Sequence, residues 1–268
     1  MTATTVLLRL GLVALVLAAL PAGAFAASKG PGYQTGFTKW ADGGLSGFTG
    51  SGVSFDGTQL ALNLNAATTE TDPGGMYNGG AYKVGEAVGP VWPVGFAFTE
   101  AIASWNATTP SGTWVEVLLR AQVGARWTKW HNMGVWASGT DTIQRHSVQL
   151  QGDADGYVAT DTLVLTLKKE TAGALQMKVR LFSAGSAIPT VQRLSLAYNT
   201  AAPKKFSASA GNPANWNTLL AVPECSQMIY PDGGNVWCSP TSTSMTLGYW
   251  GVDAGPCEPR VRAAVNGV

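Results

Sequence analysis

Three cysteines are the residues of this chain best suited to covalent chemistry. Cys225, Cys238 and Cys257 lie near the C-terminus, and no cysteine precedes them. A thiolate is a strong nucleophile, and in an oxidising compartment two thiols tend to pair. The odd number leaves one thiol that needs a role, and the grouping assigns the thiol chemistry to a C-terminal module of its own.

The segment after the second cysteine predicts a helix over residues 239–249. Pro240 suits the first turn, where a backbone N–H has no helical partner, and Gly251 suits the end. The interior is rich in Ser and Thr, which are weak helix formers. We therefore expect this helix to be buried and to pack through Met245 and Tyr249.

Such a helix places Cys238 at its N-terminus. The free backbone N–H groups and the helix dipole favour a thiolate there, which suits a nucleophile. The alternative interpretation is a small buried hydrophobic residue, because a cysteine at a helix start is suggestive but not specific.

The residues that precede this C-terminal module have the alternating pattern of β-strands. Apolar and polar residues alternate over residues 114–123, 163–167 and 175–181, and the last segment has Gln176, Lys178 and Arg180 on its polar face. Residues 53–64, 95–105 and 191–198 have similar character between Gly-rich turns. The fold class is therefore mainly β, with an antiparallel, jelly-roll-like β-sandwich.

The domain boundaries follow from composition. Residues 201–215 are rich in small residues, Lys and Pro without a period, which indicates a linker. The β-sandwich then occupies residues 36–200, and residues 216–268 form a second, small module that would be marginally stable alone. We interpret this second module as incomplete.

Residues 1–26 are interpreted as a signal peptide. An apolar stretch over residues 10–20 follows Arg9, and Ala24 and Ala26 form a small-x-small pattern that predicts cleavage before Ala27. The stretch is shorter than the roughly 20 residues that span a bilayer, although an uncleaved anchor is the alternative. We expect a secreted, extracellular protein without a stable membrane span after cleavage.

Composition and charge exclude several classes of function. With 46% hydrophobic and 12% charged residues, the chain is globular rather than disordered. Its formal net charge is +1 and no run of Lys or Arg matches a row of phosphates, so we expect no nucleic-acid partner. Nothing predicts a cofactor. His131 and His146 match no common metal-ligand spacing, so we expect structural roles for both and no metal site.

Two clusters in the strand region have two interpretations each. Trp127, Trp130 and Trp136 serve either as packing, which we favour, or as a platform for stacking sugars. Three aspartates offer oxygen ligands for calcium, but their spacing misses that of an EF-hand loop and Asp-Gly pairs are common in turns. These residues are Asp153, Asp155 and Asp161.

The C-terminal segment resembles a known family. The motifs SQM at residues 226–228, YPDGG at 230–234 and VWCSPTSTSM at 236–245 are similar to secreted bacterial papain-like cysteine peptidases, in the branch of the bacteriocin-processing, double-glycine leader peptidases. The resemblance implies that Cys238 is the nucleophile and Gln227 the side-chain donor of the oxyanion hole. It also implies that residues 216–268 are the first, helical part of a papain-like α+β domain.

These roles suggest a hypothesis for the other two thiols. If Cys238 is the nucleophile, Cys225 and Cys257 form a disulfide. Pairings that include Cys238 would abolish the nucleophile.

The chain departs from the family in one respect. A papain-like peptidase needs a His to accept the thiol proton and an Asn or Asp to orient it, and no His follows Cys238. We therefore expect a truncated form that ends inside a further helix, begun at Glu258 and Pro259. The alternatives are a degenerate member without catalysis, or a site that recruits His131 or His146.

The sequence thus predicts a secreted cysteine peptidase that acts on peptide or protein substrates, cell-wall peptides among them, with little activity in this chain. An amidase or transpeptidase would use the same thiol. The alternative function is a secreted β-sandwich that binds carbohydrate, such as cell-wall glycan, or another cell-surface partner, with a vestigial peptidase segment.

Overall fold

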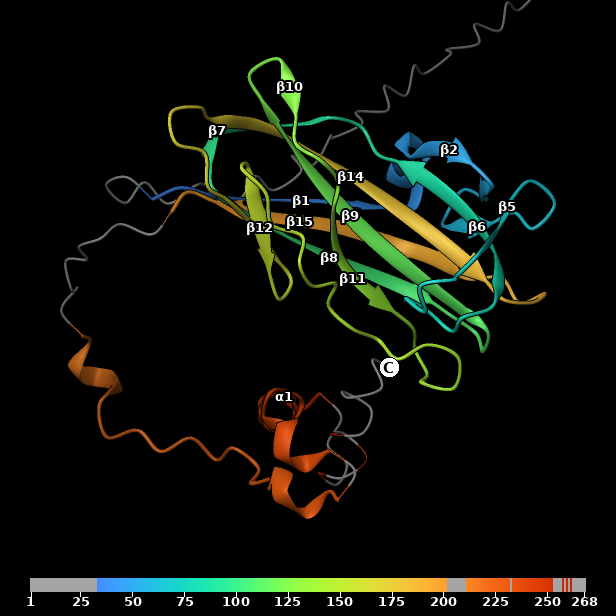
Figure 1. Cartoon of the computed structure of the whole chain (residues 1–268). Helices are drawn as coiled ribbons and strands as arrows, with labels where there is room; N and C mark the ends of the chain where they lie inside the picture. Colours follow the sequence, from blue (N-terminus) through green and yellow to red (C-terminus); the bar gives the residue numbers. More distant parts are fainter. Residues whose placement is uncertain are drawn as a thin grey trace, which may run out of the picture.

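Antiparallel strands dominate this protein, as the sequence predicts for a mainly β fold. The structure is a computed structural model that describes residues 33–201, 211–231 and 233–252, together with Cys257, Pro259 and Val261. The predicted signal peptide and most of the predicted linker lie outside the described residues. The strands form two sheets that pack as a sandwich (Figure 1).

The first sheet has seven strands. They are β1 (Thr35–Ala41), β3 (Val53–Phe55), β4 (Leu60–Leu62), β8 (Glu100–Thr108), β12 (Gly156–Ala159), β13 (Thr162–Leu165) and β15 (Thr190–Asn199). Strand β15 is central, because it pairs with β8 along one edge and with β1 and β4 along the other.

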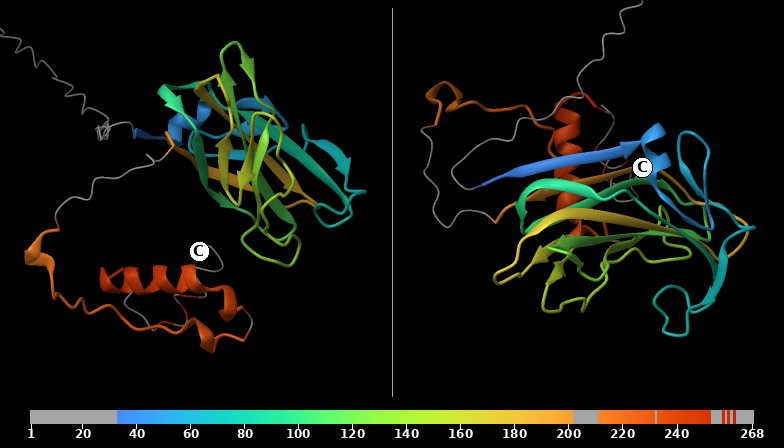
Figure 2. Two further views of the ribbon diagram at one scale, coloured as in Figure 1. Left: turned by 60° about the vertical axis from the view of Figure 1, so that its left-hand side comes forward. Right: turned by 90° about the horizontal axis from the view of Figure 1, so that it is seen from above.

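The second sheet has eight strands. They are β2 (Thr49–Ser51), β5 (Thr68–Thr71), β6 (Ala81–Val88), β7 (Trp92–Phe98), β9 (Thr113–Val123), β10 (Arg126–Trp127), β11 (His131–Trp136) and β14 (Ala172–Ser183). The long strands β9 and β14 pair along their whole length and form its centre. The further views in Figure 2 show the two sheets as separate layers.

In the part of the chain that the structure describes, the helical elements are short. The 3-10 helices are η1 (Asp42–Gly47), η2 (Pro213–Asn215), η3 (Gln227–Ile229) and η4 (Gly234–Val236), and the α-helix α1 spans Cys238–Tyr249. None of the helices in the described part of the chain is long and apolar enough to cross a membrane.

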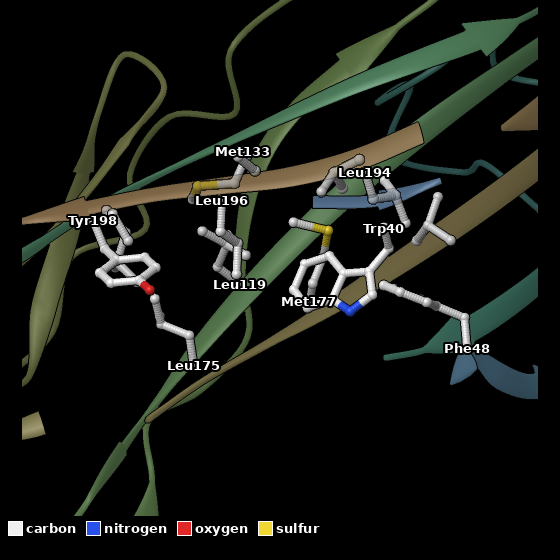
Figure 3. Close-up of a cluster of buried hydrophobic side chains, with 14 of the residues drawn as sticks. Trp40, Phe48, Leu119, Met133, Leu175, Met177, Leu194, Leu196 and Tyr198 are labelled. Carbon is white, nitrogen blue, oxygen red and sulfur yellow. The ribbon is translucent and has the colours of Figure 1, made fainter. Parts of the chain in front are cut away.

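The core lies between the two sheets. Leu119 of β9 and Met177 of β14 are almost completely buried, as are Leu194 and Leu196 of β15 in the other sheet (Figure 3). Burial of a side chain of this size contributes about 1.5–3 kcal/mol. The alternation in the sequence therefore identified the inward-facing residues of the long strands correctly.

Two predicted strands are each two strands in the structure. Residues 53–64 form a hairpin of β3 and β4, because the Asp56 carboxylate accepts the backbone N–H groups of Thr58 and Gln59 at 2.8 and 2.9 Å and turns the chain. These hydrogen bonds hold the pKa of Asp56 well below its usual range. Residues 95–105 also divide, because the chain leaves the second sheet after β7 and enters the first at β8.

The outer face of β9 is also partly buried, which alternation alone did not indicate. Trp114 is fully buried in a second apolar cluster with Phe182, and Glu116 is only 1% exposed. The Glu116 carboxylate pairs with Arg180 at 3.0 Å and accepts the Tyr77 hydroxyl at 2.7 Å. Loss of hydration and the Glu116 charge raise the pKa of Tyr77. The buried charge is therefore paired and hydrogen-bonded, as burial requires.

Candidate active site

Helix α1 has both of the termini that the sequence indicates. It begins at Cys238, one residue before the predicted start, and Pro240 lies in its first turn. At the other end Gly251 adopts φ +72°, and its N–H bonds the Gly248 carbonyl at 3.2 Å, while Val252 N–H bonds Leu247 at 2.9 Å. These two bonds form a Schellman motif, in which glycine is favoured.

Cys238 occupies the first residue of α1, and its thiol is free and exposed. The first helical hydrogen bond beyond it runs from Thr241 N–H to the Trp237 carbonyl at 3.1 Å. Backbone N–H groups of the first turn have no helical acceptor, so they favour negative charge at this end. The position allows the thiol to reach an external carbonyl.

The other two cysteines form the disulfide Cys225–Cys257, with Cα atoms 5.9 Å apart. The predicted pairing is therefore confirmed. It leaves Cys238 as the free thiol. It joins Cys225, two residues before η3, to Cys257, near Pro259 and Val261, which are both helical. Val261 is fully buried.

Gln227 begins η3 and lies against the turn that leads into α1. Its amide Nε2 donates to the Gly234 carbonyl at 2.7 Å, and Gly234 begins η4, which directly precedes Trp237 and the helix. A Cβ at Gly234 would lie 2.1 Å from the Gln227 carbonyl oxygen, so only glycine fits. The glycine pair in the YPDGG motif is the sequence signal for this close contact.

The structure thus brings Gln227 to the segment that positions Cys238. Tyr230 and Trp237 pack at 5.3 Å between ring centroids and connect η3 to the helix start. The described residues show no hydrogen bond between Gln227 and Cys238.

The buried face of α1 differs from the prediction. Met245 is half-buried and Tyr249 is 38% exposed, whereas Thr241 and Ser244 are buried. The expected packing through Tyr249 is therefore wrong. Met245 lies one turn after Thr241 on the same side of the helix, whereas Tyr249 lies outside the buried face that the two small polar residues form.

Neither histidine lies at the thiol. His131 is fully buried inside the β-sandwich on β11, and desolvation lowers its pKa, although the Asp153 carboxylate opposes this effect. His146 is exposed, and its Nδ1 lies 2.7 Å from the Gln144 carbonyl oxygen. Among the described residues, neither imidazole contacts Cys238 by a hydrogen bond, and burial prevents His131 from serving as its base.

The tryptophan cluster combines two environments. Trp136 packs against the main core, as predicted, but Trp127 and Trp130 belong to neither apolar cluster. Instead, the guanidinium carbon of Arg120 lies 4.4 Å from each of their ring centroids. Core packing is therefore wrong for these two residues. The available signal was Arg120, a charged residue within the alternating segment 114–123.

The three aspartates serve turns and ion pairs. The Asp153 carboxylate accepts the N–H groups of Asp155 and Gly156, and Asp155 pairs with Arg126 at 2.6 Å. The Asp161 carboxylate accepts the neighbouring Thr162 hydroxyl at 3.2 Å. Within the described residues no group of three His, Cys, Asp or Glu could hold a metal ion.

Comparison with known proteins identifies the family. The chain belongs to the family of the peptidase C39 N-terminal domain, whose model matches residues 34–199. This match supports a peptidase-related function. It covers the β-sandwich and ends before the segment that contains Cys238.

Other comparisons find few similar proteins. No curated protein matches the chain. A solved structure from a study of promiscuous specificity in carbohydrate-binding modules of the β-sandwich superfamily matches 60% of this chain and 55% of its own, with 12% identity and a TM-score of 0.26. The chain therefore spans about half the length of that structure.

Proposed function

We propose that this chain belongs to a secreted cysteine peptidase in which Cys238 is the nucleophile. The observation that carries the proposal is the exposed free thiol at the first residue of α1, in a chain of the C39 N-terminal domain family. Residues 1–26 would be the signal peptide, 36–200 the sandwich, 201–215 the linker and 216–268 the peptidase segment.

The proposed reaction is acyl transfer from a peptide bond. The Cys238 thiolate attacks the carbonyl carbon, a C–S bond forms, and the carbonyl electron pair moves to oxygen. The C–N bond then breaks, and the leaving amine takes a proton. Water hydrolyses the resulting thioester and releases the acid and the thiol.

Gln227 is the proposed side-chain donor to the oxyanion, beside the backbone N–H of Cys238. Its bond to the Gly234 carbonyl uses one of two amide N–H groups and fixes the amide plane, and the second N–H stays available for an oxyanion. A donor of this kind contributes about 2.7–4 kcal/mol in a comparable oxyanion hole.

The general base is the missing element. The sequence has no histidine after Cys238, and both of its histidines lie in the β-sandwich. We therefore expect these 268 residues to hydrolyse peptides slowly, because a nucleophile and its base act as a unit. A peptide or protein is the proposed substrate.

Alkylation of Cys238 tests the proposed nucleophile. With iodoacetamide at pH 7, Cys238 of the folded protein should react several-fold faster than the same residue unfolded in urea, because the thiol is exposed and the free backbone N–H groups of the first helical turn stabilise negative charge that develops during the attack. N-acetylcysteine, measured in both solvents, corrects for the effect of urea.

Peptide mapping by mass spectrometry supplies the control. Without reductant the label should be on Cys238 alone, and Cys238→Ser should remain unlabelled. Equal rates in the folded and unfolded chains, or label on Cys225 or Cys257, would contradict the proposal.

A further inference from the structure

The outer face of the second sheet carries a cation without an acidic partner. Arg120 of β9 donates from Nε to the Gln176 side-chain oxygen at 2.9 Å, and the Gln176 amide donates to the Gly89 carbonyl at 2.9 Å. The next cations along β14 are paired, Lys178 with Glu86 and Arg180 with Glu116. Among the described residues, no carboxylate pairs with Arg120.

Two tryptophans hold this guanidinium in place. Its central carbon lies 4.4 Å from the ring centroids of both Trp127 and Trp130, within the range of cation–π attraction. Partial burial lowers the pKa of Arg120, which reflects the cost of its unneutralised charge. A guanidinium has five N–H donors, and Gln176 engages only part of them. The rest can bind a carboxylate bidentately.

A groove of about 710 Å³ lies beside this cluster, and Gln122 is the residue that links the two. Gln122, which lies two residues after Arg120 on β9, lines it and is in register with Trp127 on β10. The groove also has small residues such as Ala174, a second cation, Lys169, and the carboxylate of Glu170, which is paired with Arg126 at 2.6 Å. Its volume is within the range of about 300–1,000 Å³ that is usual for ligand sites.

We infer that this face binds a glycan that carries carboxylate groups, with Arg120 as the carboxylate receptor. Trp127 supplies an apolar surface for a sugar ring, and the Gln122 amide supplies donors and acceptors for hydroxyls. An extended peptide that adds as a strand fits less well at Arg120, because β9 and β14 pair with each other along their length there and leave no free edge.

Binding of tetragalacturonate to the full chain tests this inference. By calorimetry at low salt, tetragalacturonate should bind about tenfold or more tightly than its methyl ester, which has the same size without the charge. Arg120→Gln should weaken binding of the acid by about tenfold or more and bring it near that of the ester. Arg193→Gln, at an exposed arginine of β15 in the other sheet, should bind as the original chain does.

Trp127→Ala provides a second variant. Because β10 is a two-residue strand at the edge of the sheet, removal of the Trp127 side chain leaves the core intact. It should also weaken binding, with an unchanged melting temperature. Equal affinity for the acid and the ester would overturn the inference, as would no binding at millimolar concentration. Tighter binding of an acetylated tetrapeptide with a free carboxylate would overturn the choice of a glycan. None of these results depends on Cys238.

Discussion

His131 shows how one buried side chain links stability to pH. It is fully buried on β11, and neither ring nitrogen has a hydrogen-bond partner of good geometry among the described residues. Desolvation lowers its pKa, so the folded protein takes up this proton at a lower pH than the unfolded chain, whose imidazole titrates near the usual value of 6.5. Its contribution to stability is therefore complete above about pH 6.5 and declines as the pH falls further.

Replacement by an apolar residue tests this relation. In His131→Leu, the free energy of unfolding should change less between pH 7.5 and pH 5.5 than in the original protein, by up to about 1.4 kcal/mol per pH unit below 6.5. Urea unfolding at several pH values measures it. As a control, His146→Gln changes an exposed histidine and should leave the pH dependence of the unfolding free energy as in the original protein. If this free energy fell equally with pH in His131→Leu and in the original protein, the proposed role of His131 would be contradicted.

At the scale of elements, the end of α1 depends on one backbone conformation. Gly251 has φ +72°, where a Cβ is strained. Gly251→Ala should destabilise the helix end by about 1 kcal/mol, whereas Gly251→Asn should cost less because Asn tolerates this conformation. Hydrogen exchange of the Gly251 and Val252 amides measures the effect. Equal protection in both variants would contradict the Schellman assignment.

At the scale of the whole molecule, the two parts differ in what stabilises them. The sandwich has a continuous core between its sheets, whereas the C-terminal segment leaves large apolar residues exposed, for example Leu219 at 97% and Trp250 at 73%. The disulfide Cys225–Cys257 closes this segment, and a loop of that length contributes about 3–4 kcal/mol in the chain-entropy model.

Removal of the disulfide should therefore affect only one part. In Cys225→Ser with Cys257→Ser, limited proteolysis should cut within residues 213–252 at lower protease concentration, while the fragment that contains residues 35–199 persists. Cys238→Ser is the matched control and should be digested like the original chain. Equal loss of both parts in the double variant would show that the sandwich depends on the disulfide.

Periodicity predicted the long strands because it reports which residues share a face. Leu175, Met177 and Leu181 were placed on the core side of β14, and all three are buried. The same pattern could not show that Trp114 and Glu116 are also buried, since their covering residues come from distant loops such as the one that carries Tyr77. Nor could it show where the chain changes sheets between β7 and β8.

Local chemistry in the sequence by itself determined the mainly β fold, the ends of α1 and the position of Cys238 at its start, because caps, turns and alternation act between near neighbours. The tertiary structure alone decided that Gln227 lies against Gly234, that Thr241 and Ser244 form the buried face, and that Arg120 lies between two tryptophans without an acidic partner. These outcomes depend on which segments far apart in the chain meet, and no local pattern contains that information.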